Sequence, residues 1–138
     1  FNIMFVNLFM REEINNWWMQ AKRDLVSAKN SYKSKDYYAS VFWCQQSMEK
    51  ALKAYIMFSK RISKDPLNFH SLIKLAIYAN IPKNFYKFLR MMSPEYYMTR
   101  YPDASEMVPY NLYDEEDNKL ILKETGELIE WVELQMKE

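Results

Sequence analysis

The sequence has very little glycine, cysteine and histidine, with one of each among its 138 residues. Sheet proteins use glycine in their tight turns, so a single glycine argues against a sheet. The lone Cys44 excludes a disulfide scaffold and indicates a reducing compartment, and we expect the protein to be cytoplasmic. One histidine without cysteine partners is poor evidence for a metal site, and we expect neither a metal nor a cofactor.

The chain also lacks a strong net charge and a long apolar run. Its formal charge of +1 does not indicate a general polyanion binder. No stretch reaches the ~20 apolar residues that a membrane-spanning helix needs, so we expect no membrane role. Residues 1–10 are apolar but have no basic start or cleavage site of a secretory signal. We expect residues 1–9 to be an N-terminal extension that need not belong to the fold, and residues 10–138 to form one helical domain.

What the sequence does contain is helical periodicity, interrupted by proline- and aspartate-containing turns. The predicted helices span residues 11–32, 37–60, 70–79, 82–92 and 114–137. We expect Asp36 to cap the second helix, and a neighbouring helix to approach closely at Gly126. Residues 94–113 form a long connection, which is often functional in a compact domain. The predicted fold class is all-α, an antiparallel bundle of four to five helices.

Residues 45–54 are apolar around much of the predicted helix, yet they carry a compact polar stripe. With ~3.6 residues per turn, the stripe occupies about one third of the helix surface. Its members are Gln46, Glu49, Lys50 and Lys53. The apolar side chains extend beyond one face, so we expect this helix to be covered on more than one side, by neighbouring helices or by a second copy of the chain.

Three short motifs follow one another along the chain. They are WxxAxxDLxxA at residues 18–28, QQxxEKALKA at residues 45–54 and RYPD at residues 100–103, with His70-x-Leu72 as weaker support. Together they resemble a small, stand-alone prokaryotic member of the HEPN (higher eukaryotes and prokaryotes nucleotide-binding) domain family. The resemblance implies a bundle of four or five helices that is often dimeric. Such domains are often encoded beside a small nucleotidyltransferase, in pairs of the toxin–antitoxin kind.

The ribonuclease members of that family carry an arginine, then four to six residues, then a histidine. The histidine exchanges protons with the 2′-hydroxyl or the leaving oxygen, and the arginine stabilises the developing phosphorane charge. Here the histidine is His70, and the positions for the arginine hold Ser63, Lys64 and Asp65. Arg61 lies too far away in sequence. The motif is therefore absent, and the chain is more consistent with a protein that is not an enzyme.

The segment around Arg100 is the best candidate for a binding site. Arg100 lies between Tyr97 and Tyr101, so it could bind a phosphate while an aromatic ring stacks on a base. Lys50 and Lys53 are the cations that would complete such a nucleotide-binding groove.

The same residues also have structural interpretations. Arg100 would pair with Asp103 or Glu49, and the neighbouring tyrosines would cover the bundle or form a partner surface. Glu49 and Lys53 have the favourable i,i+4 order, which contributes ~0.2–0.5 kcal/mol on any exposed helix.

The remaining polar candidates are a carboxylate, an amide and the histidine. Asp24 would form an ion pair with Lys50 or Lys53, or it would form one wall of a polar groove that also contains Gln46. His70 is expected to begin the third helix and to cap or pack there.

Three functional hypotheses remain open on this sequence. The first is a non-catalytic HEPN-type interaction module, which pairs with itself and with a small nucleotidyltransferase in a toxin–antitoxin-like system and binds a nucleotide or RNA. The alternative is a metal-independent ribonuclease toxin with a degenerate active site. The third is a plain nucleotide-binding domain. A homodimer is predicted because the second helix is apolar beyond one face and tyrosine and methionine are plentiful.

Overall fold

The computed structural model describes residues 3–64, 66–94 and 109–137, and every regular element in these ranges is helical. The elements are α1 (Ile3–Lys33), α2 (Tyr37–Lys60), α3 (Leu72–Ala79), the 3-10 turn η1 (Lys83–Phe85), α4 (Tyr86–Met92), the 3-10 turn η2 (Pro109–Asn111) and α7 (Glu115–Met136). The prediction of an all-α bundle is confirmed.

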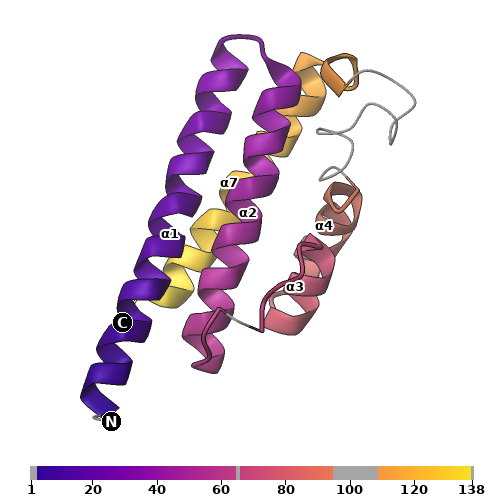
Figure 1. The fold of residues 1–138 in the computed structure, drawn as a ribbon. Helices are drawn as coiled ribbons and strands as arrows, with labels where there is room; N and C mark the ends of the chain where they lie inside the picture. The colour runs from indigo at the N-terminus through magenta and orange to yellow at the C-terminus, as the bar shows by residue number, and fades with distance from the viewer. Residues whose placement is uncertain (1–2, 65, 95–108, 138) are drawn as a thin grey trace.

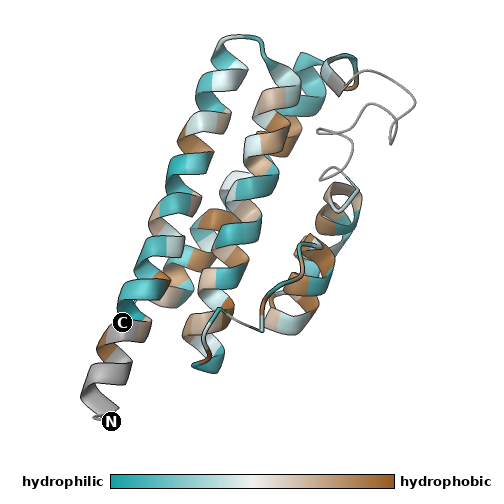
Figure 2. Ribbon diagram, in the orientation of Figure 1, coloured by the Kyte–Doolittle hydropathy of each residue, from teal (hydrophilic) through white to brown (hydrophobic). Residues whose placement is uncertain are grey.

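The helices are arranged around α2 (Figure 1). Helix α1 runs antiparallel to α2, and α7 returns from the end where α1 and α2 are joined toward the end where both termini lie. Helices α3 and α4 pack along the side of α2 that faces away from α1. Figure 2 shows hydrophobic residues concentrated on α2, α3 and α4, with hydrophilic residues along much of α1.

None of the helices among the described residues has both the length and the apolar character that crossing a membrane requires.

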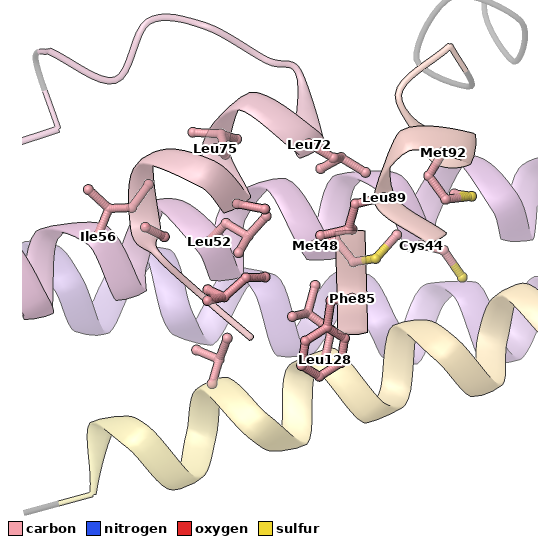
Figure 3. Close-up of a cluster of buried hydrophobic side chains, with 14 of the residues drawn as sticks. Cys44, Met48, Leu52, Ile56, Leu72, Leu75, Phe85, Leu89, Met92 and Leu128 are labelled. Carbon is pink, nitrogen blue, oxygen red and sulfur yellow. The ribbon is translucent and has the colours of Figure 1, made fainter. Parts of the chain in front are cut away.

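The core fills the space between α2 and the helices that surround it (Figure 3). Side chains of α2 point from the centre toward α3, α4 and α7. The fully or almost fully buried residues drawn there are Cys44, Met48, Leu52, Ile56, Leu72, Leu75, Leu89, Met92 and Leu128. Helix α2 is therefore covered on more than one side within a single chain, as predicted.

The ends of the helices differ from the sequence prediction in three places. Helix α1 begins at Ile3 rather than near residue 11, and its first turns project beyond the ends of α2 and α7 (Figure 1). Asp36 occupies the N-cap position of α2, as predicted, but its side chain makes no capping hydrogen bond. At α3 the cap is Ser71, whose side chain accepts a hydrogen bond from the Lys74 amide, and His70 lies outside the helix.

A chain with one glycine must end its helices with other residues. Lys35, Arg61 and Asn80 adopt left-handed conformations, with φ of 62°, 55° and 57°. Glycine normally occupies such positions because it has no Cβ to clash with the backbone. These three residues turn the backbone sharply away from α1, α2 and α3, which allows short connections in the absence of glycine.

Gly126 lies inside α7, but no neighbouring helix approaches it. A Cβ placed on this residue would have no atom within 4 Å, so the predicted close approach is wrong. We expect Gly126→Ala to raise the free energy of unfolding by about 0.5–1 kcal/mol, because alanine loses less backbone entropy in a helix. A urea titration measures this change. A lower stability in the variant would contradict the conclusion that there is open space for a Cβ at Gly126.

The thiol of Cys44 is buried in the core around α2. Burial raises its pKa from 9.0 to about 12, so the thiol remains protonated between pH 7 and 9. The three-unit difference leaves about a thousandfold less thiolate than in the unfolded chain. We expect Ellman's reagent to modify native Cys44 at least that much more slowly than the urea-unfolded protein. Rapid modification of the native protein would show that the site opens to solvent.

Candidate functional site

A chain of polar side chains crosses the interface between α1 and α2 and continues to the segment before α3. Its members, in order, are Gln20, Asp24, Lys50, Gln46, Gln45, Glu49, Lys53 and His70. Each member is joined to the one before it by a hydrogen bond or ion pair, except that Lys53 and His70 both contact Glu49. This polar network is the only place in the described residues where the predicted site residues come together.

The network depends on the close approach of α1 and α2. Ala21 and Ala28 are fully buried in that interface, and their carbonyl oxygens accept hydrogen bonds from Ser47 (2.7 Å) and Ser40 (2.8 Å). The small side chains bring the two backbones together, and the serines fix their register. Asp24, which lies between the two alanines on α1, is thereby held against α2.

Asp24 forms an ion pair with Lys50, one of the two partners that the sequence suggested. The Lys50 Nζ lies 2.5 Å from Asp24 Oδ2, and Gln20 Nε2 donates to the other carboxylate oxygen at 2.8 Å. The Asp24 side chain is 2% exposed, whereas the Lys50 side chain is 21% exposed. Lys50 also donates to Gln46 Oε1 at 3.3 Å, which connects the pair to the rest of the network.

Glu49 is the centre of the second half of the network. Its Oε2 lies 3.1 Å from Lys53 Nζ and 2.9 Å from His70 Nδ1, and its Oε1 accepts from Gln45 at 3.2 Å. Glu49 and Lys53 were predicted as a pair on an exposed helix, but Lys53 is only 2% exposed and Glu49 is also buried. A buried ammonium that is already paired is a structural element of the bundle rather than a free anion-binding group.

His70 lies at the solvent edge of the network. Its side chain is 52% exposed, and it approaches the Glu49 carboxylate from the segment before α3. The predicted role as the start or cap of the third helix is wrong, because Ser71 supplies the cap. Histidine and glutamate at hydrogen-bond distance could exchange a proton with a substrate, so this is the part of the network that could act as an acid or a base.

Trp17 covers the outer side of the network. Its ring lies 5.7 Å from Lys53 Nζ and 5.4 Å from Lys64 Nζ, within the range of cation–π attraction. Next to it is a hollow of about 170 Å³, lined by Asn16, Trp17, Gln20 and Lys50. Sites for small molecules usually measure ~300–1,000 Å³, so this hollow is too small to enclose a nucleotide.

The sequence identified six members of this network in advance: Asp24, Gln46, Glu49, Lys50, Lys53 and His70. The other four candidates, Arg100, Tyr97, Tyr101 and Asp103, lie outside the described residues. Sequence reasoning missed Gln20 and Gln45. Gln20 precedes Asp24 by one helical turn, and Gln45 belongs to the same motif as Gln46, so spacing alone could have suggested both.

Within residues 3–64, 66–94 and 109–137, no three histidine, cysteine or acidic side chains are grouped closely enough to hold a metal ion.

Comparisons with known proteins agree with this architecture. A crystal structure of an archaeal HEPN homologue, ST0689, is 28% identical, with a TM-score of 0.75, covering 91% of this chain and 98% of that one. The structure of TT1696 from Thermus thermophilus is 24% identical, with a TM-score of 0.78 and coverage of 90% and 98%, and it shows the shared fold. A comparison with curated proteins found no significant match. The family model of the HEPN domain matches residues 14–135, and the chain therefore belongs to the HEPN domain family.

Proposed function

We propose that this chain is a non-catalytic HEPN-type interaction module. In this proposal it pairs with a second copy of itself and with a small nucleotidyltransferase, in a system of the toxin–antitoxin kind. It binds a nucleotide or RNA through the segment around Arg100, together with Lys50, a partly exposed cation of the polar network.

The observation that carries the non-catalytic part is the missing arginine of the family motif, since the positions that its spacing allows before His70 hold Ser63, Lys64 and Asp65. A ribonuclease of this kind needs a guanidinium beside the histidine, because the bidentate fork stabilises the phosphorane oxygens. Among the described residues, His70 contacts the Glu49 carboxylate, and the cation paired with that carboxylate is the buried Lys53. Arg61 lines a cavity whose lining does not include His70, and Lys64 lies over Trp17.

The pairing part is supported by exposed apolar side chains on several helices. Monomeric proteins rarely expose large contiguous patches of hydrophobic side chains, and protein interfaces are enriched in methionine and tyrosine. The large exposed hydrophobic side chains among the described residues lie on α1, α3, α4, η2 and α7, and they are Leu8, Met19, Val26, Ile77, Tyr78, Met91, Tyr110, Leu120 and Leu134.

Two measurements test the pairing. Light scattering at micromolar concentration should give about twice the chain mass of 16.8 kDa. Co-expression with the nucleotidyltransferase encoded beside this chain, if the genome has one, should yield a stable complex. A monomer at every concentration and no complex would contradict the proposal.

The catalytic question has a direct assay. We expect the purified protein to leave single-stranded and structured RNA intact in the presence of EDTA, because the arginine of the family motif is missing. The alternative, a metal-independent ribonuclease, is favoured by one observation: His70 is half exposed at 2.9 Å from a carboxylate. Cleavage that disappears in His70→Ala would establish that alternative and overturn the non-catalytic proposal. Arg61→Gln serves as the control, since its cavity lies elsewhere.

A further inference from the structure

A cavity lies away from the polar network, at the end of the bundle where both termini are found (Figure 1). It measures about 560 Å³ and is formed by the first half of α1 and the last turns of α2 and α7. This volume falls within the ~300–1,000 Å³ of typical sites for small molecules. His70 and Glu49 are not among its lining residues, so any role of this cavity is independent of the function proposed above.

The floor of the cavity is apolar and aromatic. Ile14 and Trp18 come from α1, Met57 and Phe58 from α2, and Met136 from α7. Trp18 and Phe58 are partly exposed, and Met57 is almost completely buried. Such a surface favours an aliphatic or aromatic body that can leave water.

The rim of the cavity is cationic. Arg11, Arg61 and Lys137 line it, with Glu133 as the single acidic residue. In the part of the chain that the structure describes, neither Arg11 nor Arg61 takes part in a salt bridge, a side-chain hydrogen bond or a cation–π contact. Two guanidinium groups on one cavity with no partner among the described residues are available to an anion from solution.

We propose that this cavity binds a small amphipathic anion, a carboxylate or phosphate ester with an aliphatic or aromatic body. The body would lie against Trp18 and its neighbours, and the anionic head would be held by Arg11 and Arg61. A planar guanidinium binds a carboxylate or phosphate through two parallel hydrogen bonds, which gives the site its preference for an oxyanion. A neutral apolar molecule would leave both arginines unused, and a strongly hydrated polyanion would leave the aromatic floor unused.

The test uses octanoate as the probe and the neutral octan-1-ol as its uncharged analogue. In a heteronuclear NMR titration of the full chain, octanoate should shift the indole signal of Trp18 and should bind at least about tenfold more tightly than octan-1-ol. The double variant Arg11→Gln/Arg61→Gln should lose that preference, because each charge-assisted hydrogen bond contributes about a factor of ten or more. Arg23→Gln, an exposed arginine of α1 that does not line the cavity, is the matched control and should bind like the wild type.

Three outcomes would overturn the proposal. The first is no shift at Trp18 up to the solubility limit of octanoate. The second is equal affinity for octanoate and octan-1-ol, and the third is binding of octanoate that survives in the double variant. The last measurement is co-sedimentation of the protein with anionic phospholipid vesicles. A protein that sediments with vesicles but does not bind octanoate would have a cationic rim that binds a membrane surface, and the small-molecule site would be rejected. A variant that blocks the mouth, Asn15→Trp, should abolish binding of both probes while retaining the circular dichroism spectrum of the wild type.

Discussion

Replacing Glu49 by leucine is expected to lower the free energy of unfolding by roughly 3–5 kcal/mol, the usual cost of removing one partner of a buried ion pair. The reason is the position of Lys53, whose side chain is 2% exposed and whose ammonium lies 3.1 Å from the Glu49 carboxylate. Without Glu49, this ammonium stays in the bundle with no carboxylate beside it, and Gln45 and His70 lose an acceptor as well. For a domain of this size, such a loss lowers the melting temperature on the order of 10–20 °C.

The double variant Glu49→Leu/Lys53→Met distinguishes a lost attraction from an uncompensated charge. When both charges are replaced by apolar side chains of similar volume, no buried charge remains, and most of the stability should return. Glu130→Leu is the matched control, because Glu130 is an exposed glutamate of α7 and its loss should change stability by no more than about 0.5 kcal/mol. If Glu49→Leu changes the free energy of unfolding as little as this control does, the structure overstates the contribution of the buried pair to stability.

Only part of the structure around Glu49 could be predicted from the sequence. Helical periodicity predicts the long helices within a few residues, since an amphipathic pattern follows directly from which face is buried. The central place of α2 was also predictable, because apolar residues occur around more than one face. The start of α1 at Ile3 was not, since residues 1–9 show no cap and no polar face that would distinguish a continuing helix from an extension.

The polar network was predictable only where its contacts are local. Glu49 and Lys53 are one helical turn apart, so their pairing follows from spacing, but their burial does not. Burial depends on α1 and the segment before α3, which come together in three dimensions. The contact between Glu49 and His70 joins residues 21 positions apart through a loop, and no periodic signal describes it. The long-range pair of Asp24 and Lys50 could be proposed only with Lys53 as an equal alternative, because both lysines lie on the same stripe.

Breaking the Asp24–Lys50 pair should also lower the free energy of unfolding strongly, and the loss should differ between the two partners. Lys50→Met leaves the carboxylate of Asp24, whose side chain is 2% exposed, with only the Gln20 amide as a donor. We expect a loss of roughly 3 kcal/mol, the lower end of the range for an uncompensated buried charge, because that amide remains. Asp24→Leu should cost less than half as much, since the Lys50 side chain is 21% exposed and its flexible stem can carry the ammonium to water.

Urea titrations of the two single variants and of Asp24→Leu/Lys50→Met measure this asymmetry. The double variant should be more stable than Lys50→Met alone, since the stranded carboxylate is gone, and the cycle should give a coupling energy of at least about 1 kcal/mol. Lys119→Met, at an exposed position of α7, controls for the loss of a lysine and should be nearly neutral. Equal losses for Asp24→Leu and Lys50→Met would mean that Lys50 is confined as strictly as Asp24. The lysine would then be a fixed part of the bundle and could not turn outward, and Lys50 would cease to be a candidate for binding a phosphate.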